Sequence, residues 1–482
     1  MTLPDLAARR RRIARLRRMP LLSTRLWRRR LTVWCGALVV GLVAVLFAWA
    51  ADDATAVFAW VVRRQPAGML LLAPAGLALS VWLTRAYFPG ASGSGIPQVM
   101  AALHMSDPAA VRRVLSLRVA GGKIVLTLIG LASGASIGRE GPTVQISSAI
   151  MHSLGGVLRL PRRDAQRALV LAGGAAGVSA AFNTPLAGVV FAIEELSHSF
   201  EARTSSTLLI GVILAGITTL LLDGNTTYFG VTTAALPLGR GWLAVLSCGV
   251  AGGLCGGAFA RLLILAAGGL PGRLGRLARA RPVAFAAGCG VALALIGLAS
   301  GGTTYGTGYA EARRLVAGQD LPAGYFALKF AATVVSYVSG MPGGIFAPSL
   351  AVGAGLGHWI AHLLPGAPAG TVVLLAMVGY FAGVVQAPIT AAVIVLEMTA
   401  DQGMTLPLMA TALLAFAVSR LVCRRPLYGA LARRYLAAVE EQAKLGSPSA
   451  AHSNGPSGPS EPLGSSAQTR HGRAAPKPAL FK

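Results

Sequence analysis

Long apolar runs follow one another through most of the chain, separated by short polar segments. They recur from about residue 31 to about residue 423, at 31–50, 68–83, 208–222 and 242–260 among others. Each is close to the length of about 20 residues that a helix needs to cross a hydrocarbon core. The pattern predicts an all-α polytopic membrane protein.

Many of the other apolar segments are short and broken by glycine or proline, and the chain contains 60 Gly and 27 Pro. A bilayer tolerates a broken helix only where the freed backbone faces protein or a wet cavity. Glycine also allows helices to approach closely. Because transporters place their sites at interrupted helices, these breaks indicate where a substrate would bind.

The composition agrees with a membrane location, since 54% of residues are hydrophobic and only 12% are charged. The net charge of +26 would suggest nucleic-acid binding in a soluble protein. However, eleven arginines precede the first apolar run, within 1–30, and Arg424, Arg425, Arg433 and Arg434 follow the last. By the positive-inside rule both termini are expected in the cytoplasm. We expect the basic segment at 1–30 to contact anionic lipid, and we expect no nucleic acid as partner.

An arginine-rich start can also belong to a targeting peptide, but no small-residue cleavage site ends the first apolar run.

The cysteines show no CxxC or Cys/His spacing. We therefore expect them to be small core residues, and we expect no disulfides, metal ligands or cofactor. They are Cys35, Cys248, Cys255, Cys289 and Cys423.

The chain divides into three parts by composition. We expect a basic cytoplasmic arm at 1–30, a membrane transport domain at 31–439, and a disordered cytoplasmic tail at 440–482 that is rich in Ser, Gly and Pro. The membrane domain is interpreted as two repeats, at about 31–225 and 240–439. Nothing after it is long or apolar enough to form a second folded domain.

The repeats are suggested by an internal similarity between 183–194 and 386–397. Both segments have an early proline, an apolar run and a glutamate nine residues after the proline, Glu194 and Glu397. About forty residues upstream of each proline lies a glycine-rich break that also ends in proline. Chance similarity of two apolar runs is the alternative, and residue identities do not reveal whether the halves are inverted.

Five breaks in the membrane domain combine glycine or a polar residue with proline, which suits the first turn of a helix. They lie at 93–97, 138–142, 183–185, 343–348 and 386–388. A single break is more often a kink, but several converging helix starts offer free N–H groups and partial positive charge to a small anion. Hydroxyls such as those of Ser94 and Tyr428 would complete a site that holds an anion without a full cation.

Carboxylates are the second group of candidates, because only 17 Asp or Glu occur and few lie in apolar stretches. Those few are Glu140, Glu194, Glu195 and Glu397. A charge at the bilayer centre costs about 2.5–3.5 kcal/mol, so such groups are functional by default, and burial favours the protonated form that a proton relay requires. Glu140 lies at a helix start, where it would compete with an anion for the same amides. The other three could instead be solvated or paired with arginine.

These motifs resemble the CLC family of chloride channels and chloride/proton exchangers. Gly-Ser-Gly-Ile-Pro at 93–97, Gly-Arg-Glu-Gly-Pro at 138–142 and Gly-Ile-Phe-Ala-Pro at 344–348 are similar to its three anion-site signatures, in the same order. Asn-Thr-Pro-Leu-Ala-Gly at 183–188 and Pro-Leu-Tyr at 426–428 also match. The resemblance covers essentially the whole membrane domain and implies an inverted repeat of broken and tilted helices.

The resemblance also implies where chloride binds. The hydroxyls of Ser94 and Tyr428 would hold a central chloride together with the main-chain N–H groups of Ile345 and Phe346. Backbone around the signatures would complete the anion site, at Gly95, Gly141 and Ala347.

For proton transfer, the resemblance implies that Glu140 is the external gating glutamate and Glu195 the internal proton-transfer glutamate. A family member of this bacterial type would be a homodimer in the inner membrane, with one pathway per subunit and without cytoplasmic CBS domains. The chain departs from bacterial exchangers after the first signature, where it has Gln98, Met100 and His104 instead of acidic residues.

The leading interpretation is secondary active exchange of chloride against protons. A serine in the first signature is associated with chloride, which disfavours a fluoride exchanger, and the two glutamates resemble the exchangers. The alternative is a passive voltage- or pH-gated chloride channel. A membrane-embedded enzyme is disfavoured, because no histidine in an apolar segment is placed as a base for Ser94 and no metal cluster is evident.

Overall fold

The computed structural model describes residues 24–157, 163–197, 202–224, 227–230, 236, 239, 241–364, 366–399 and 401–445. Most of the expected basic arm and of the expected tail therefore lies outside the described residues. The helices of the described part are α2 (Thr24–Arg64), η1 (Pro66–Gly68), α3 (Met69–Ala86), η2 (Pro89–Ala91), α4 (Ile96–His104), α5 (Pro108–Val114), α6 (Leu117–Leu131), α7 (Glu140–Val157), α8 (Arg163–Phe182), α9 (Pro185–Phe191), the π-helical η3 (Ala192–Ser197), α10 (Ala202–Asp223), α11 (Trp242–Ala267), α12 (Gly272–Ala280), α13 (Pro282–Ala299), α14 (Tyr309–Val316), α15 (Tyr325–Val338), α16 (Phe346–Leu363), α17 (Ala369–Val385), α18 (Pro388–Thr399), η4 (Gln402–Met404), α19 (Thr405–Val422) and α20 (Leu427–Leu445).

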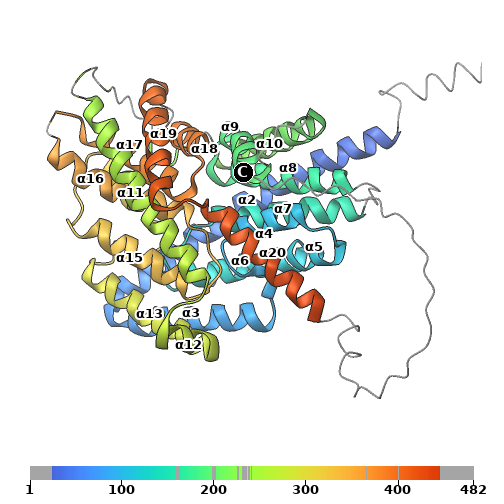
Figure 1. The fold of residues 1–482 in the computed structure, drawn as a ribbon, viewed down its shortest axis with the longest axis horizontal. Coiled ribbons are helices and arrows are strands. Elements are labelled where there is room, and N and C mark those ends of the chain that lie inside the picture. Colours follow the sequence, from blue (N-terminus) through green and yellow to red (C-terminus); the bar gives the residue numbers. More distant parts are fainter. Residues whose placement is uncertain are drawn as a thin grey trace, which may run out of the picture. The chain divides into compact units, whose positions relative to one another are not determined.

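The all-α prediction is confirmed, since the described chain forms helices and contains no strand. Figure 1 shows these helices crossing at many angles, with long and short ones intermixed. Within the described residues, seven helical segments are long and apolar enough to cross a membrane. The four runs singled out in the sequence lie in α2, α3, α10 and α11. The protein is a multi-pass membrane protein.

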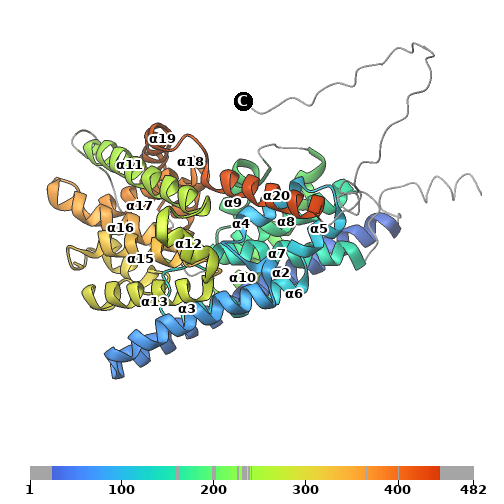
Figure 2. The same cartoon turned by 60° about the horizontal axis from the view of Figure 1, so that its bottom comes forward.

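Helices in the membrane domain pack through glycine. Helix α11 meets α17 at Gly252 and Gly256, where an added Cβ at Gly252 would lie 2.5 Å from the carbonyl carbon of Gly379. Any larger side chain would push the two backbones apart. Helix α2 is the longest helix and runs along α10, α8, α7 and α6, as Figure 2 shows for the blue helix.

All five predicted helix starts are confirmed. Helices α4, α7, α9, α16 and α18 begin within or directly after the five glycine- and proline-containing breaks. The two halves also share their backbone form, because Asn183 and Gln386, just before α9 and α18, have positive φ angles of 55° and 62°. Among the described residues, no other non-glycine residue has a positive φ. The expected limits of the two repeats stay a prediction. Helix α20 continues to Leu445, six residues beyond the expected end of the membrane domain.

Each half of the chain caps a helix of the other half. The Glu194 carboxylate accepts hydrogen bonds from the backbone N–H groups of Ile389 (3.1 Å) and Thr390 (2.6 Å) at the start of α18. Glu397, at the same position of the second segment, accepts from Leu186 (3.1 Å) and Ala187 (2.7 Å) at the start of α9. These carboxylates are thus neither free in solvent nor paired with arginine; they accept hydrogen bonds from first-turn N–H groups, which have no partner within the helix.

Candidate anion site

The glycine-rich breaks of the two halves meet at the centre of the site. Gly138 and Gly344 form an antiparallel bridge, in which the N–H of Gly138 donates to the Gly344 carbonyl (2.7 Å) and the N–H of Gly344 donates to the Gly138 carbonyl (2.8 Å). The first signature joins them, because the N–H of Gly343 donates to the Gly93 carbonyl (3.3 Å). Three segments far apart in sequence are thereby fixed side by side, and helices α4, α7 and α16 start from them.

Glycine is required where the first two signatures touch. Gly95 has a φ of 108°, and an added Cβ there would collide with the carbonyl of Gly141. A Cβ at Gly141 would lie 2.6 Å from the Ser94 carbonyl oxygen. The backbones of α4 and α7 can approach this closely only because neither residue has a side chain.

Two buried hydroxyls face this region without a protein partner. The side-chain oxygens of Ser94 and Tyr428 have no hydrogen bond to any described atom, although Ser94 is 3% exposed and Tyr428 is fully buried. The Tyr428 ring lies 5.8 Å from the ring of Phe346, at the start of α16. Each hydroxyl is therefore a candidate donor to a polar ligand near the starts of α4 and α16.

Glu140 binds an amide of the opposite half. Its side chain is fully buried; one carboxylate oxygen accepts from the backbone N–H of Ala347 (3.4 Å) and the other from the hydroxyl of Tyr309 (2.7 Å). The first contact is the one expected of a carboxylate that competes with an anion for the N-terminus of α16.

Tyr309 was not identified from the sequence. It begins α14 and belongs to the segment Gly-Thr-Gly-Tyr at 306–309. That segment repeats the Gly-Ser-Gly-Ile pattern at 93–96 in the other half. The repeat could therefore have marked this position as part of the site.

The arginine of the second signature is paired with α2. One guanidinium nitrogen of Arg139 forms an ion pair with Asp52 (2.9 Å) and donates to the Ala48 carbonyl (2.6 Å), both on α2. The other donates to the Tyr228 hydroxyl (3.1 Å). The Arg139 charge is thus paired beside α2, although it remains within electrostatic reach of Glu140 and Tyr309.

A buried lysine, also missed in the sequence, shapes the first signature. The Lys123 ammonium group donates to the carbonyls of Ala91 (2.8 Å) and Gly93 (2.6 Å), directly before Ser94. Lys329, at the matching place in the other half, donates to the carbonyls of Thr304 (3.0 Å) and Gly306 (2.9 Å). Each lysine lies fifteen residues before its bridged glycine, a spacing that the sequence carries.

Glu195 lies apart from its neighbour Glu194. It is 3% exposed and sits in the π-helical turn η3, and one of its carboxylate oxygens has no described partner. The Tyr428 side chain lies within electrostatic reach of both Glu195 and Glu140. A buried carboxylate with a free oxygen can exchange a proton, whereas Glu194 is engaged in capping α18.

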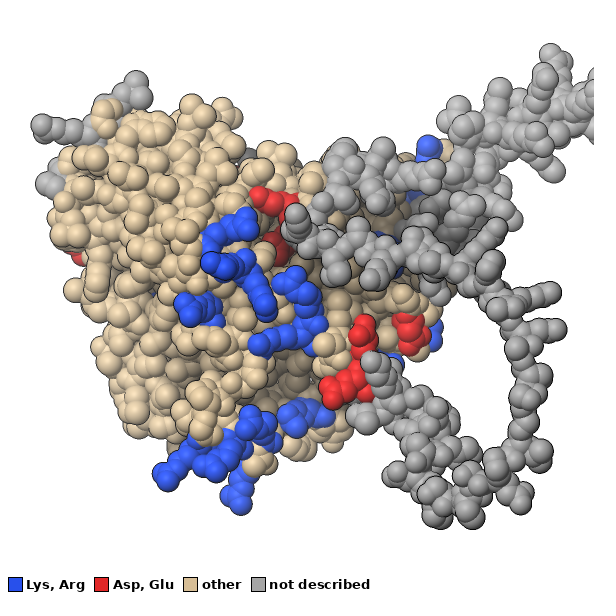
Figure 3. All heavy atoms as spheres, in the orientation of Figure 1, with Lys and Arg blue, Asp and Glu red and all other residues tan. Residues whose placement is uncertain are grey.

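A cavity of about 470 Å³ opens beside the site. Ser92, Gly93 and Gly343 line it, and Arg279 from α12 lies at its edge. Figure 3 shows Lys and Arg side chains gathered on the face of the molecule that carries α12 and the start of α20. The lining includes Gly93 of the first signature and Gly343, directly before the third, so a basic surface lies near both breaks.

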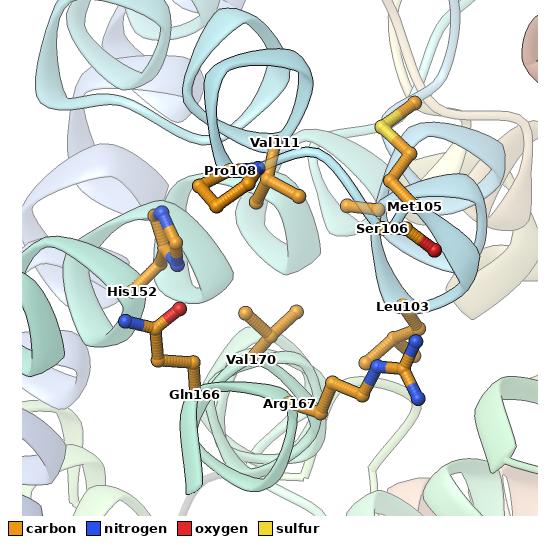
Figure 4. Close-up of a pocket in the computed structure, with 10 residues that line it drawn as sticks. Leu103, Met105, Ser106, Pro108, Val111, His152, Gln166, Arg167 and Val170 are labelled. Carbon is orange, nitrogen blue, oxygen red and sulfur yellow. The ribbon is translucent and has the colours of Figure 1, made fainter. Parts of the chain in front are cut away.

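A second, smaller cavity lies between α4, α5, α7 and α8 and has a volume of about 40 Å³. Figure 4 shows His152, Gln166 and Arg167 around it. None of the expected site residues lines this cavity.

Gln98, one of the residues that differ from bacterial exchangers after the first signature, stabilises the loop of that signature. Its side chain accepts a hydrogen bond from the N–H of Gly95 (2.9 Å) and donates one to the Ser92 carbonyl (2.7 Å).

Fold and site together define a class: a polytopic helical membrane protein in which broken helices from two repeats meet at a buried site suited to a small anion. The family model of the voltage gated chloride channel matches residues 76–420. The chain belongs to this family, the CLC family.

Its relatives are transporters. The chain is 33% identical over 389 residues to the H(+)/Cl(-) exchange transporter ClcA of Yersinia pestis bv. Antiqua (strain Angola), covering 75% of this chain and 77% of the relative. It also resembles a solved slow cyanobacterial Cl⁻/H⁺ antiporter, with a TM-score of 0.73, 26% identity and coverage of 85% of this chain and 98% of the antiporter. A CLC-type fluoride/proton antiporter has the same fold, with a TM-score of 0.69, 23% identity and coverage of 83% and 96%. The predicted CLC-type fold is thus confirmed.

Proposed function

We propose that this protein transports chloride across a membrane in exchange for protons. The observation that carries the proposal is the position of Glu140, whose buried carboxylate binds the Ala347 amide next to the unpaired hydroxyls of Ser94 and Tyr428. A carboxylate and a chloride ion compete for the same donors there. The names of the ClcA relatives and of the cyanobacterial antiporter support the same activity.

The coupling follows from charge. A proton that binds the Glu140 carboxylate neutralises it and weakens its bond to the Ala347 amide, so that the side chain leaves and chloride enters. When chloride departs, the carboxylate loses its proton and returns to the amide. The Glu140 carboxylate and chloride thereby alternate at the Ala347 amide, and each entry of chloride requires a proton on Glu140.

We assign the central chloride to the hydroxyls of Ser94 and Tyr428 and to the amides of Ile345 and Phe346. Backbone at Gly95, Gly141 and Ala347 completes the anion path. Support comes from the burial of both hydroxyls and from the position of Ile345 as the residue that caps α16.

Glu195 is the internal proton donor and acceptor in this proposal. Its burial and its unpartnered oxygen support that role. We further propose a homodimer in the bacterial inner membrane with both termini in the cytoplasm, in line with the basic residues at both ends of the membrane domain. Enzymatic chemistry is not part of the proposal.

The test uses purified full-length protein in liposomes with a chloride gradient and a clamped voltage. Exchange predicts that chloride movement drives protons uphill, as recorded with a pH electrode. Chloride flux without proton movement would indicate the passive channel instead.

Two variants test the glutamates in the same assay. Glu140→Gln should keep chloride flux and lose proton movement, because an amide cannot release a proton. Glu195→Gln should do the same through loss of the internal donor. Coupled proton movement that persists in either variant would refute that assignment, and Asp53→Asn, an exposed change on α2, serves as the control.

A further inference from the structure

Outside the anion site, a group of metal-ligating side chains lies at the far end of α16. Asp320, His358 and His362 place one ligand atom each within 4.8 Å of one another. No metal ligands are predicted from the sequence, yet two histidines four residues apart lie on the same face of a helix, a spacing that zinc sites use. Asp320 comes from the connection between α14 and α15.

We propose that Asp320, His358 and His362 bind a divalent transition-metal ion of the Zn²⁺ class. Two imidazole nitrogens and one carboxylate oxygen suit Zn²⁺ and related ions, whereas Ca²⁺ and Mg²⁺ prefer oxygen ligands alone. Three protein ligands leave a fourth position for water or an anion. This binding site does not depend on the proposed transport activity.

Local hydrogen bonds prepare the ligands. Nδ1 of His362 lies 2.8 Å from the His358 carbonyl oxygen, so Nδ1 carries the hydrogen and Nε2 is free to bind a metal. Nδ1 of His358 lies 3.9 Å from a carboxylate oxygen of Asp320. The Asp320 side chain is 85% exposed, so it can turn toward an ion at little cost, while the His358 side chain is only 12% exposed.

The backbone around the cluster is already fixed, and there is room for an ion. The indole N–H of Trp359, next to His358, donates to the carbonyl of Ala323 (2.6 Å), three residues after Asp320. A cavity of about 180 Å³ adjoins the three ligands. It is lined by residues of α14, α16, α17 and the α14–α15 connection.

An ion at this position would join the far ends of the two elements that hold Glu140. Helix α16 starts beside Ala347 and ends at His362 and Leu363; α14 starts at Tyr309 and leads to Asp320. Both donors to the Glu140 carboxylate therefore belong to segments that the ion would tie together. We infer that the bound ion hinders release of Glu140 and slows transport, a consequence that rests on the proposed function.

Binding is tested with tag-free full-length protein by titrating Zn²⁺ in a calorimeter and Co²⁺ in a visible spectrometer. We expect one saturable ion per chain and the visible absorption that Co²⁺ gives with nitrogen and oxygen ligands. His358→Ala combined with His362→Ala should weaken Zn²⁺ binding by at least about tenfold. Substitution of a residue that merely supports a metal ligand already costs about that much. Absence of Zn²⁺ binding by the unchanged protein would overturn the proposal.

The matched control is His104→Ala. His104 also lies 2.8 Å from the carbonyl four residues before it, Met100, but it is not part of the cluster. Zn²⁺ affinity should be unchanged in this variant. Affinity retained in the double variant, or lost equally in the control, would refute the assignment, and the single change His362→Ala, at an exposed position, repeats the test if the double variant fails to fold.

Regulation is tested by chloride flux in liposomes with saturating Zn²⁺. Flux should fall in the unchanged protein and stay constant in the double histidine variant. If the unchanged protein binds Zn²⁺ but its chloride flux does not fall, the regulatory step is refuted. If the unchanged protein shows no chloride flux even without Zn²⁺, the result counts against the transport proposal instead.

Discussion

At the residue scale, the contacts of Glu140 determine how firmly the proposed gate is held. Its carboxylate has one backbone donor at 3.4 Å and one hydroxyl donor at 2.7 Å. The shorter bond comes from Tyr309, so a residue outside the three signatures provides the tighter contact. Hydrogen bonds to charged groups contribute about 1.5–3 kcal/mol each, enough to change the proton equilibrium of the gate.

Tyr309→Phe tests this contact. Loss of the hydroxyl destabilises the charged carboxylate, so protonation requires less acid and the pH of half-maximal chloride flux should rise by about one unit or more. The measurement is chloride efflux from liposomes across a pH series. Tyr305→Phe is the control, because its buried hydroxyl contacts Met69 and Ala294 in another cluster. An unchanged pH profile would show that Tyr309 does not position the gate.

Tyr428→Phe tests the central site. Removing one hydroxyl donor should weaken chloride binding by about tenfold, which corresponds to about 1.4 kcal/mol. Calorimetric titration of chloride measures the affinity. Tyr380→Phe is the matched control, since its hydroxyl is also buried without a described partner but lies on α17. Equal affinities in all three proteins would exclude Tyr428 as a ligand.

At the element scale, helix starts and the groups behind them build the site. The loop before α4 is held from behind by Lys123, which satisfies carbonyls that would otherwise be buried without partners. A lysine in this position holds the loop through its carbonyl groups. The same device recurs at Lys329 in the second half.

Lys123→Met keeps the length of the side chain but leaves those carbonyls unpaired. We expect the free energy of unfolding to fall by about 1–3 kcal/mol for each unpaired carbonyl group. We also expect weaker chloride binding, because the loop that carries Ser94 loses its support. Thermal unfolding and chloride calorimetry report the two effects. Arg118→Met, an exposed change on the same helix, should alter neither. Stability equal to that of the unchanged protein would contradict the role of Lys123.

At the scale of the whole molecule, the two repeats hold each other together. Glu194 caps α18 and Glu397 caps α9, so each half completes a helix of the other. The antiparallel bridge between Gly138 and Gly344 is a second link of the same kind. Reciprocal contacts of this type make the fold of one half depend on the presence of the other.

Glu194→Gln and Glu397→Gln test this dependence. Each change should lower the free energy of unfolding by about 0.5–2 kcal/mol, the range for loss of a helix cap, because the amide keeps only one uncharged acceptor oxygen. Unfolding of the purified protein is measured for both single variants and the double variant, with Asp53→Asn as an exposed control. Losses no larger than in the control would show that the carboxylates are dispensable.

The helix starts, the candidate hydroxyls and the four apolar glutamates could be predicted because each leaves a local signal: a proline after glycine, or a charge in an apolar run. The sequence also carried the repeat at 183–194 and 386–397. Tyr309 and Lys123 could be marked only by comparing the two halves, and Asp320 could not be assigned to the histidine pair of α16, because these roles depend on partners far away in the chain.

By itself, the sequence determined the membrane class, the order of the motifs and where helices begin, since hydrophobic period, glycine and proline act over a few residues. Only the tertiary structure decided which helix start faces which carboxylate. Glu194 and Glu195 are adjacent and chemically identical, yet one caps α18 and the other keeps a free oxygen. The π-helical turn and the packing of the second repeat separate them, and both are long-range outcomes that local patterns do not contain.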